Sequence, residues 1–187
     1  MKARAATRPH ASFLADERGL SGMEFGLIAP VFALLMIGTV DISGMLATKL
    51  DLNASISAAT AYAQMNAANV NSTSGATLAS NLSLIVAHAR GPSWADSDVL
   101  VNNGPGSSVS NGARNGRGSG AGADMCYCPQ RSGTSVNWGN SRSCKAACPS
   151  GGVAGKFVSL SASHQYTPIF FRSFSGLLTT SALIQTE

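Results

Sequence analysis

The chain has 187 residues and a formal net charge of +4, and only 12% of its residues are charged. This length allows one folded domain beside a membrane segment. Four of the 13 Lys and Arg residues lie within residues 1–19, and no stripe of basic and aromatic side chains follows, which argues against a nucleic-acid-binding protein. The abundance of Ser, Thr, Asn, Gly and Ala favours a secreted or surface-exposed domain over a cytosolic enzyme.

A basic N-terminal segment precedes a long uncharged run. Sixteen residues without a charge, Phe25 to Val40, lie between Glu24 and Asp41. As a helix they extend about 24 Å, and counting from Leu20 gives about 31 Å, compared with roughly 30 Å for the core of a bilayer. The longer count places Glu24 inside the span at a cost of about 2.5 kcal/mol or more. We therefore predict a membrane span over residues 20–40 in which Glu24 is paired or functional.

Charges on the two sides of the span predict its orientation. Basic residues precede it, and only Asp41, Lys49 and Asp51 follow soon after it, so the N-terminus is expected to stay in the cytoplasm. No small-x-small signal-peptidase site follows the apolar run closely. Judged by insertion alone, the segment is either an uncleaved signal anchor or a helix whose leader is removed before the span.

Pro30 and two glycines are expected to shape the span. Pro30 lacks a backbone donor and would clash with the carbonyl of Gly26 in a straight helix, so a kink is predicted. Gly22 and Gly26 form a Gly-xxx-Gly pair, which lets a second helix approach closely. Because such pairs also arise by chance, the pair supports a packing face without establishing one.

Nothing after Asp41 interrupts the helix strongly, so it is predicted to continue to about Val70. Residues 20–70 would then form a rod of about 76 Å. Small and apolar residues recur at helical spacing in its outer part, namely Leu52, Ile56, Ala59 and Ala63. They suit packing on the protein's own domain or against a neighbouring rod, and both uses are expected.

Residues 71–187 are predicted to form an extracytoplasmic domain. A turn over 71–77 leads into a short helix that stops at Gly91-Pro92 and whose apolar face comprises Leu78, Leu82, Ile85 and Ala89. Asp98 to Val101 is predicted to be a strand. Residues 102–124 contain seven glycines and few apolar residues. A flexible surface loop is expected there, since a phosphate-binding loop needs a strand before it and a helix after it.

Four cysteines are packed into 23 residues: Cys126, Cys128, Cys144 and Cys148. Their spacing lacks the paired Cys-xx-Cys units typical of zinc sites. The predicted topology places them in an oxidising compartment, where disulfides persist. Because Cys126 and Cys128 are too close to bond readily to each other, we predict two disulfides that join this pair to Cys144 and Cys148. The connectivity stays open, and a zinc site is the alternative.

The C-terminal part predicts two strands. Residues Phe157 to Tyr166 alternate apolar and polar side chains, which is typical of a strand with one buried face. His164 shares the apolar face and is expected to be structural. Thr167-Pro168 ends this strand, and a final strand presents one apolar face with Leu178, Ala182 and Ile184. Aromatic residues of the connecting loop are expected to plug the core or, if exposed, to contact another subunit: Phe170, Phe171 and Phe174.

The start of the apolar helix carries a resemblance to a known family. Gly19 is followed by Leu20-Ser21-Gly22-Met23, then by Glu24-Phe25 and the long apolar run. This arrangement resembles the processing motif of type IV prepilins. The chain as a whole resembles the TadE-like minor pilins or pseudopilins of Flp/Tad (type IVb) pilus systems. The Ala/Asn-rich continuation of the helix, the Cys-x-Cys segment and the C-terminal Tyr-Thr-Pro region contribute to this resemblance.

The predicted elements indicate an α+β fold, and the resemblance implies a pilin-like subunit of a Tad-type bacterial pilus. The fold would combine one long N-terminal helix, a short second helix and a small antiparallel sheet with a disulfide-stapled loop region. The protein would lie in the bacterial inner membrane, with its N-terminus in the cytoplasm and its C-terminal domain in the periplasm. Its implied partners are a prepilin peptidase, other pilin subunits and Tad membrane assembly proteins. No cofactor or metal is implied.

The resemblance also implies roles for the residues around the start of the helix. Cleavage between Gly19 and Leu20 would remove the leader 1–19 and free the α-amino group of Leu20, which is positive at neutral pH. Glu24 lies one turn further and would pair with that amine, either within the helix or on an adjacent subunit. Gly22, Phe25, Gly26 and Pro30 would form the packing surface of the helix. The alternative for Glu24 is a carboxylate at the headgroup level that only ends the span.

Two other classes of function remain as alternatives. An anchored envelope enzyme would need a convergent set of Ser, His, Asp or Cys groups, and three scattered histidines with oxidised cysteines supply none, so no catalytic residue is predicted. An uncleaved, membrane-tethered binding module that never polymerises is the second alternative. N-terminal sequencing of the membrane-extracted protein separates it from the pilin interpretation.

Overall fold

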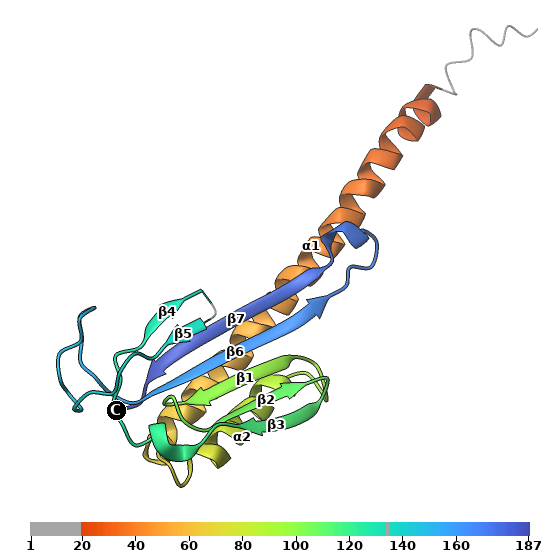
Figure 1. Ribbon diagram of the computed structural model, residues 1–187. Coiled ribbons are helices and arrows are strands. Elements are labelled where there is room, and N and C mark those ends of the chain that lie inside the picture. Colours follow the sequence, from red (N-terminus) through yellow and green to blue (C-terminus); the bar gives the residue numbers. More distant parts are fainter. Residues whose placement is uncertain (1–19, 134) are drawn as a thin grey trace, which may run out of the picture. The chain divides into compact units, whose positions relative to one another are not determined.

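The computed structural model describes residues 20–133 and 135–187, so Gly19 and the rest of the predicted leader lie outside the described residues. The helices are α1 (Leu20–Met65) and α2 (Gly75–Ala87), with short 3₁₀ helices at Ala67–Asn69, Gly120–Gly122 and Arg172–Phe174. The strands are β1 (Asp96–Val101), β2 (Gly106–Ser110), β3 (Ala113–Arg117), β4 (Gln130–Ser132), β5 (Ser135–Asn137), β6 (Phe157–Tyr166) and β7 (Gly176–Gln185) (Figure 1). The predicted α+β class is confirmed.

Helix α1 contributes to two compact units. The first extends to Val40, and the second comprises Asp41–Glu187. The helix ends at Met65, short of the predicted Val70, and the 3₁₀ helix Ala67–Asn69 follows it. Asparagine side chains compete with the helical backbone at this point: the Asn66 amide donates to the Tyr62 carbonyl, and Asn71 Oδ1 accepts the N–H groups of Thr73 and Ser74.

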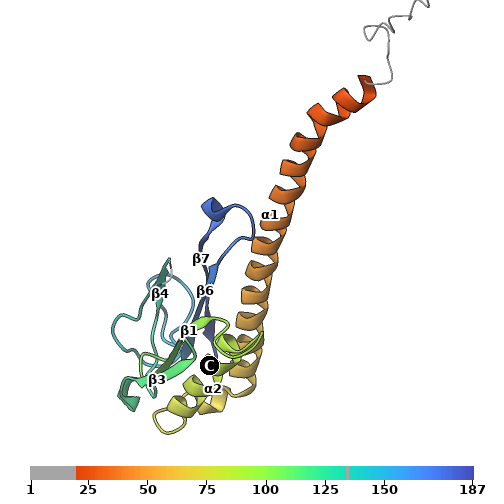
Figure 2. The same cartoon turned by 90° about the vertical axis from the view of Figure 1, so that its right-hand side faces the viewer.

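The second unit is built on a five-stranded antiparallel sheet of order β3-β2-β1-β6-β7. The part of α1 from Asp41 onward and α2 cover one face of this sheet, and the β4–β5 hairpin lies on its other side (Figure 2). The core is apolar and is formed by both helices and by strands β1 and β6: Leu52, Ile56, Ala59, Ala63, Leu78, Leu82, Val86, Val99, Val101, Val158, Leu160 and Ala162. The apolar side chains that repeat about every 3.6 residues along the helices therefore pack against those that repeat every 2 residues along the strands, in a single layer.

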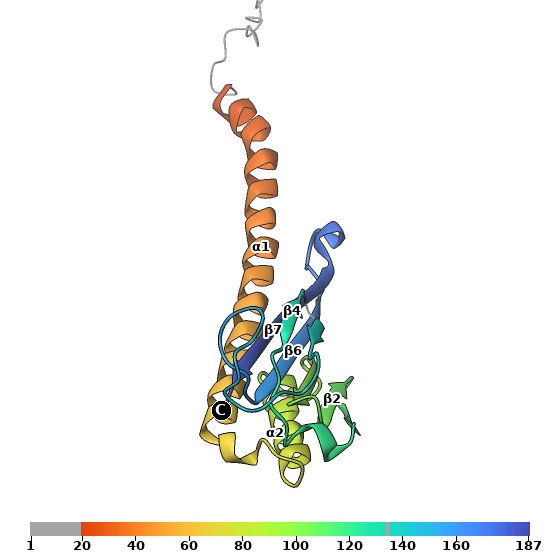
Figure 3. The same cartoon turned by 60° about the vertical axis from the view of Figure 1, so that its left-hand side comes forward.

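The strands predicted from alternation are confirmed, and so is a short second helix. α2 begins at Gly75, within the predicted turn 71–77, and ends at Ala87, so Ala89 lies beyond it. β6 buries Val158, Leu160 and Ala162 on one face, and β7 pairs with it along ten residue pairs. β1 pairs with β6 only as far as Ser163, so residues 164–166 of β6 pair with β7 alone. The two strands therefore continue as a ribbon beyond β1 and end in the loop around the 3₁₀ helix Arg172–Phe174 (Figure 3).

The prediction of a flexible loop over residues 102–124 is wrong, because this segment contains the β2–β3 hairpin. The hairpin turns at Asn111 and Gly112, whose φ angles are 49° and 78°. An Asn-Gly pair favours this tight turn because both residues tolerate positive φ. β3 is exposed along its length, and β2 buries Ser107 and Val109. The two strands therefore lack the alternation of apolar and polar side chains from which a strand is predicted.

Candidate functional site

The predicted processing site lies at the start of α1. The helix begins at Leu20, and Gly19 lies outside the described residues. Glu24 is one turn into α1 and exposed. The cleavage and the charge pair between Glu24 and the Leu20 amine stay predictions, since both depend on a new N-terminus.

The predicted packing surface of α1 is open. A Cβ atom placed on Gly22 or Gly26 meets no heavy atom within 4 Å, so another backbone has room to approach either glycine. Phe25 is exposed beside them, and α1 continues through Pro30. The glycines are thus available for helix packing, while the partner helix stays a prediction.

The first unit exposes nearly every large apolar side chain of the uncharged run: Phe25, Leu27, Ile28, Val31, Phe32, Leu34, Leu35, Met36 and Val40. Its helix is long and apolar enough to cross a membrane, with a mean hydropathy of 2.1 in the most apolar part. By length and composition it qualifies either as a membrane anchor or as a signal sequence.

Beyond Asp41, α1 has two faces within the second unit. One face carries Leu52, Ile56 and Ala59, which are buried against the sheet. Another face carries Ile42, Leu46 and Leu50, which recur every four residues and are exposed to solvent, with Met45 beside them. This apolar stripe on α1 has no covering element in the part of the chain that the structure describes.

Asp41, the first residue after the uncharged run, is a buried carboxylate with 1% of its surface exposed. Its Oδ1 accepts the N–H of Ile169 at 2.9 Å, and its Oδ2 accepts the N–H of Phe171 at 2.7 Å. The N–H of Phe170 lies between them, 3.3 and 3.2 Å from the two oxygens. Three consecutive backbone donors of the β6–β7 loop therefore converge on one carboxylate.

Tyr166 strengthens this connection between the loop and the helix. Its hydroxyl donates to the backbone carbonyl of Asp41 at 2.7 Å. The ring reaches α1 because residue 44 is glycine: a Cβ there would lie 2.7 Å from the Tyr166 hydroxyl oxygen. We call Asp41, Gly44, Tyr166 and the loop residues Ile169–Phe171 the Asp41 clamp.

The clamp also sets the charge of Asp41. Burial raises the pKa of its carboxyl, but the N–H groups of Phe171, Ile169 and Phe170 together outweigh burial and hold the pKa below the ordinary value of 3.8. The carboxylate is therefore charged at neutral pH, and its charge is balanced by hydrogen bonds from the loop. The sequence indicated Asp41 only as a charge that ends the span and helps to orient it, and its position directly after the uncharged run was the available signal for a further role.

The cysteines form two disulfides, Cys126–Cys144 and Cys128–Cys148. Each joins one residue of the first pair to one of the second, so the prediction of two long-range disulfides is confirmed. Backbone pairing supports them: Tyr127 pairs with Gly155, and Cys126 pairs with Arg142. These bonds stabilise a segment with little regular structure of its own, since β4 and β5 have only three residues each.

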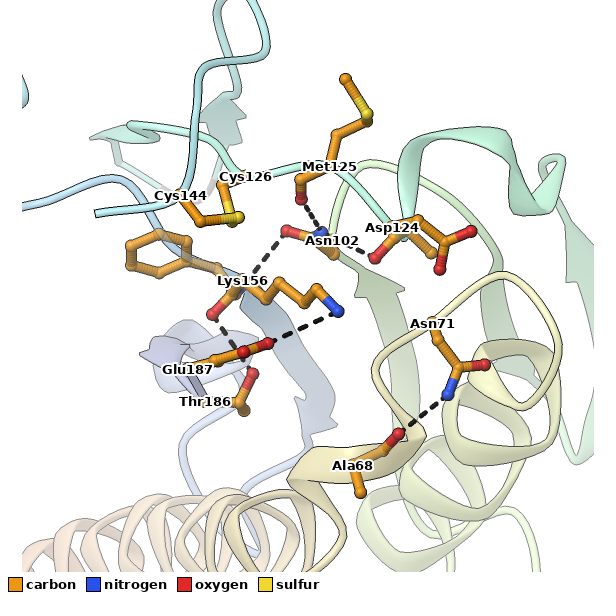
Figure 4. Close-up of polar contacts among 12 residues, drawn as sticks. Ala68, Asn71, Asn102, Asp124, Met125, Cys126, Cys144, Lys156, Thr186 and Glu187 are labelled. Carbon is orange, nitrogen blue, oxygen red and sulfur yellow. Dashed lines mark hydrogen bonds and ion pairs between the residues drawn. A yellow bond between two sulfur atoms is a disulfide. The ribbon is translucent and has the colours of Figure 1, made fainter. Parts of the chain in front are cut away.

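Asn102 connects the sheet to residues 126–148, which the two disulfides join and which we call the disulfide segment (Figure 4). Its buried side-chain amide donates to the carbonyls of Ala123 and Met125 at 2.9 and 2.5 Å, and its Oδ1 accepts the N–H of Phe157 at 3.1 Å. One side chain thus connects the residues just before Cys126 with the start of β6. Its φ of 46° is a conformation that Asn tolerates better than most residues.

His164 and the arginines of β3 are engaged in structural contacts. The ring of His164 stacks on Trp94, and its Nδ1 contacts the Trp94 carbonyl. Arg117 forms an ion pair with Asp98, and Arg114 donates to Ser80. Among the described residues, no group of three His, Cys, Asp or Glu side chains is arranged to hold a metal ion.

No family model, curated protein or solved structure matches this chain. The geometry described above and the resemblance of the N-terminal motif are therefore the basis for a functional proposal.

Proposed function

We propose that this protein is a pilin-like subunit, a minor pilin or pseudopilin, of a Tad-type bacterial surface pilus. One observation carries the proposal: an exposed uncharged helix continues without a break into a helix packed on an antiparallel sheet. The resemblance of Gly19 through Glu24-Phe25 to the prepilin processing motif supports removal of the leader by a prepilin peptidase.

In this proposal residues 20–40 anchor the subunit in the inner membrane before assembly. The leader remains in the cytoplasm, and Asp41–Glu187 folds in the periplasm. The two disulfides support this location, since such bonds persist in oxidising compartments.

Assembly would use groups that the fold leaves accessible. After cleavage the Leu20 amine of an incoming subunit meets the exposed Glu24 of a subunit already in place. An apolar environment makes either charge costly when unpaired, so the pair favours one register. The exposed apolar residues Ile42, Leu46 and Leu50 extend the contact with neighbouring pilin helices or Tad membrane assembly proteins past the membrane.

The N-terminus of the mature protein tests the proposal. Protein extracted from membranes is expected to begin at Leu20, and Gly19→Val is expected to leave the leader attached because it adds bulk at the cut bond. Ala15→Val adds a similar side chain within the leader and serves as the control, with normal processing expected. Mature protein that begins at Met1 would favour the uncleaved binding module, and a start after Val40 would indicate an ordinary secretory signal; either result refutes the proposal.

A further inference from the structure

The β6–β7 loop presents apolar side chains next to the end of the uncharged run in the sequence. Ile169 and Phe170 are 77% and 53% exposed, although the loop is fastened to α1 by the Asp41 clamp. Asp41 is the first residue after Val40, where the proposed span ends. The clamp therefore holds an exposed apolar loop tip beside the residue at which α1 leaves the membrane.

The backbone of this tip is prepared for an apolar environment. A backbone N–H that leaves water needs another acceptor, and losing that bond costs free energy. The N–H groups of Ile169, Phe170 and Phe171 already donate to the Asp41 carboxylate. The tip can thus leave water without leaving these three donors unsatisfied.

A basic residue follows the apolar pair. Arg172 is exposed and begins the 3₁₀ helix Arg172–Phe174. Apolar side chains with an adjacent cationic group are typical of segments that lie in the interface of a bilayer, where the cation meets lipid phosphates.

We infer that the β6–β7 loop is a second membrane contact, in which Ile169 and Phe170 enter the boundary between headgroups and acyl chains while Arg172 stays among the phosphates. This inference rests on the membrane-anchoring part of the proposed function, and it adds a lipid-binding surface to the folded domain. Lipid is favoured over a protein partner because the clamp holds the tip at Asp41, the residue that emerges from the span. The contact restrains the domain at the bilayer before assembly.

A tryptophan at the loop tip tests this contact in the full-length protein. Phe170→Trp would be reconstituted into vesicles of phosphatidylcholine and phosphatidylglycerol that carry bromine on acyl carbons near the headgroup. The parent protein supplies the background from Trp94 and Trp138. Val153→Trp is the matched control: Val153 is 48% exposed and lies four residues before β6 begins, whereas the loop follows the other end of β6. β6 separates the two probes by about 33 Å.

The loop probe is expected to be quenched by brominated lipid at least about twofold more strongly than the Val153→Trp probe. Adding Ile169→Asp to the loop probe should remove most of that difference without releasing the protein from vesicles, because a charge beside the probe opposes insertion. If the protein floats with vesicles while the loop probe is not quenched, the lipid contact is refuted and the anchor stands. If the protein does not float with vesicles, the membrane span of the proposed function fails and this inference fails with it.

Discussion

Replacing Asn102 with Ala is expected to destabilise the folded domain by about 4 kcal/mol. The substitution removes the donors to the carbonyls of Ala123 and Met125 and the acceptor for the N–H of Phe157. At about 1 kcal/mol net for each hydrogen bond, these three contribute about 3 kcal/mol. Placing Ala at a φ of 46° adds about 1 kcal/mol. This sum is a large part of the 5–15 kcal/mol that holds a typical domain folded.

Asn103→Ala is a matched control for this prediction. Asn103 adjoins Asn102 and has a similar φ of 55°, but it is exposed. The control therefore carries the cost of the backbone conformation, about 1 kcal/mol, without the loss of buried hydrogen bonds.

Urea unfolding of the full chain in detergent micelles, followed by tryptophan fluorescence, measures the difference. Trp138 packs edge-on against Tyr127, next to the Cys126–Cys144 bond, and reports on the segment that Asn102 holds. The midpoint for Asn102→Ala is expected to fall at least about 1 M below that of Asn103→Ala at ordinary values of m. Equal midpoints for the two variants would refute the assigned role of the Asn102 side chain.

Three further outcomes are expected. Each disulfide closes a loop of 18 or 20 residues, so the loss of one of them by Cys144→Ser should cost about 3 kcal/mol in the chain-entropy description. Non-reducing peptide mapping should recover only the Cys126–Cys144 and Cys128–Cys148 pairs. Because the pKa of Asp41 is lowered in the folded state, its contribution to stability is present above the ordinary value of 3.8 and is lost as the pH falls through the lower folded value. Proteolysis of the β6–β7 loop should then increase in acid, and Asp41→Asn should abolish that pH dependence; an unchanged profile in the variant would contradict the clamp. Glu24→Gln should leave membrane insertion and processing intact but reduce incorporation into pili. The exposed Glu187→Gln is the control, and wild-type amounts of assembled fibre in Glu24→Gln would contradict the proposed charge pair.

Elements with a strong local pattern could be predicted from the amino-acid sequence alone. The uncharged run from Phe25 to Val40 required a long apolar helix, because few other structures satisfy so many backbone groups beside apolar side chains. Alternation along Phe157 to Tyr166 indicated β6, and apolar residues at helical spacing indicated α2. Four closely spaced cysteines in a predicted oxidising compartment indicated the two disulfides. In each case the signal and the structure that it specifies lie in the same short segment.

The β2–β3 hairpin shows where that local reading fails. Its strands consist largely of Ser, Gly, Asn and Arg, so neither period 2 nor apolar content marks them. The Asn111-Gly112 turn was the one local signal for a hairpin. β2 is held by pairing with β1, and β3 by pairing with β2, so backbone hydrogen bonds to the neighbouring strand place both strands in the sheet.

The roles of Asp41 and Asn102 become apparent only in the folded protein. Asp41 accepts hydrogen bonds from residues 128 to 130 positions later in the chain, and Asn102 accepts one from Phe157, 55 positions later. A carboxylate or amide in isolation does not indicate which distant backbone groups it will satisfy. Those partners are determined when α1, the sheet and the disulfide segment pack together, because each polar group then leaves water and needs the acceptor or donor that the fold brings beside it.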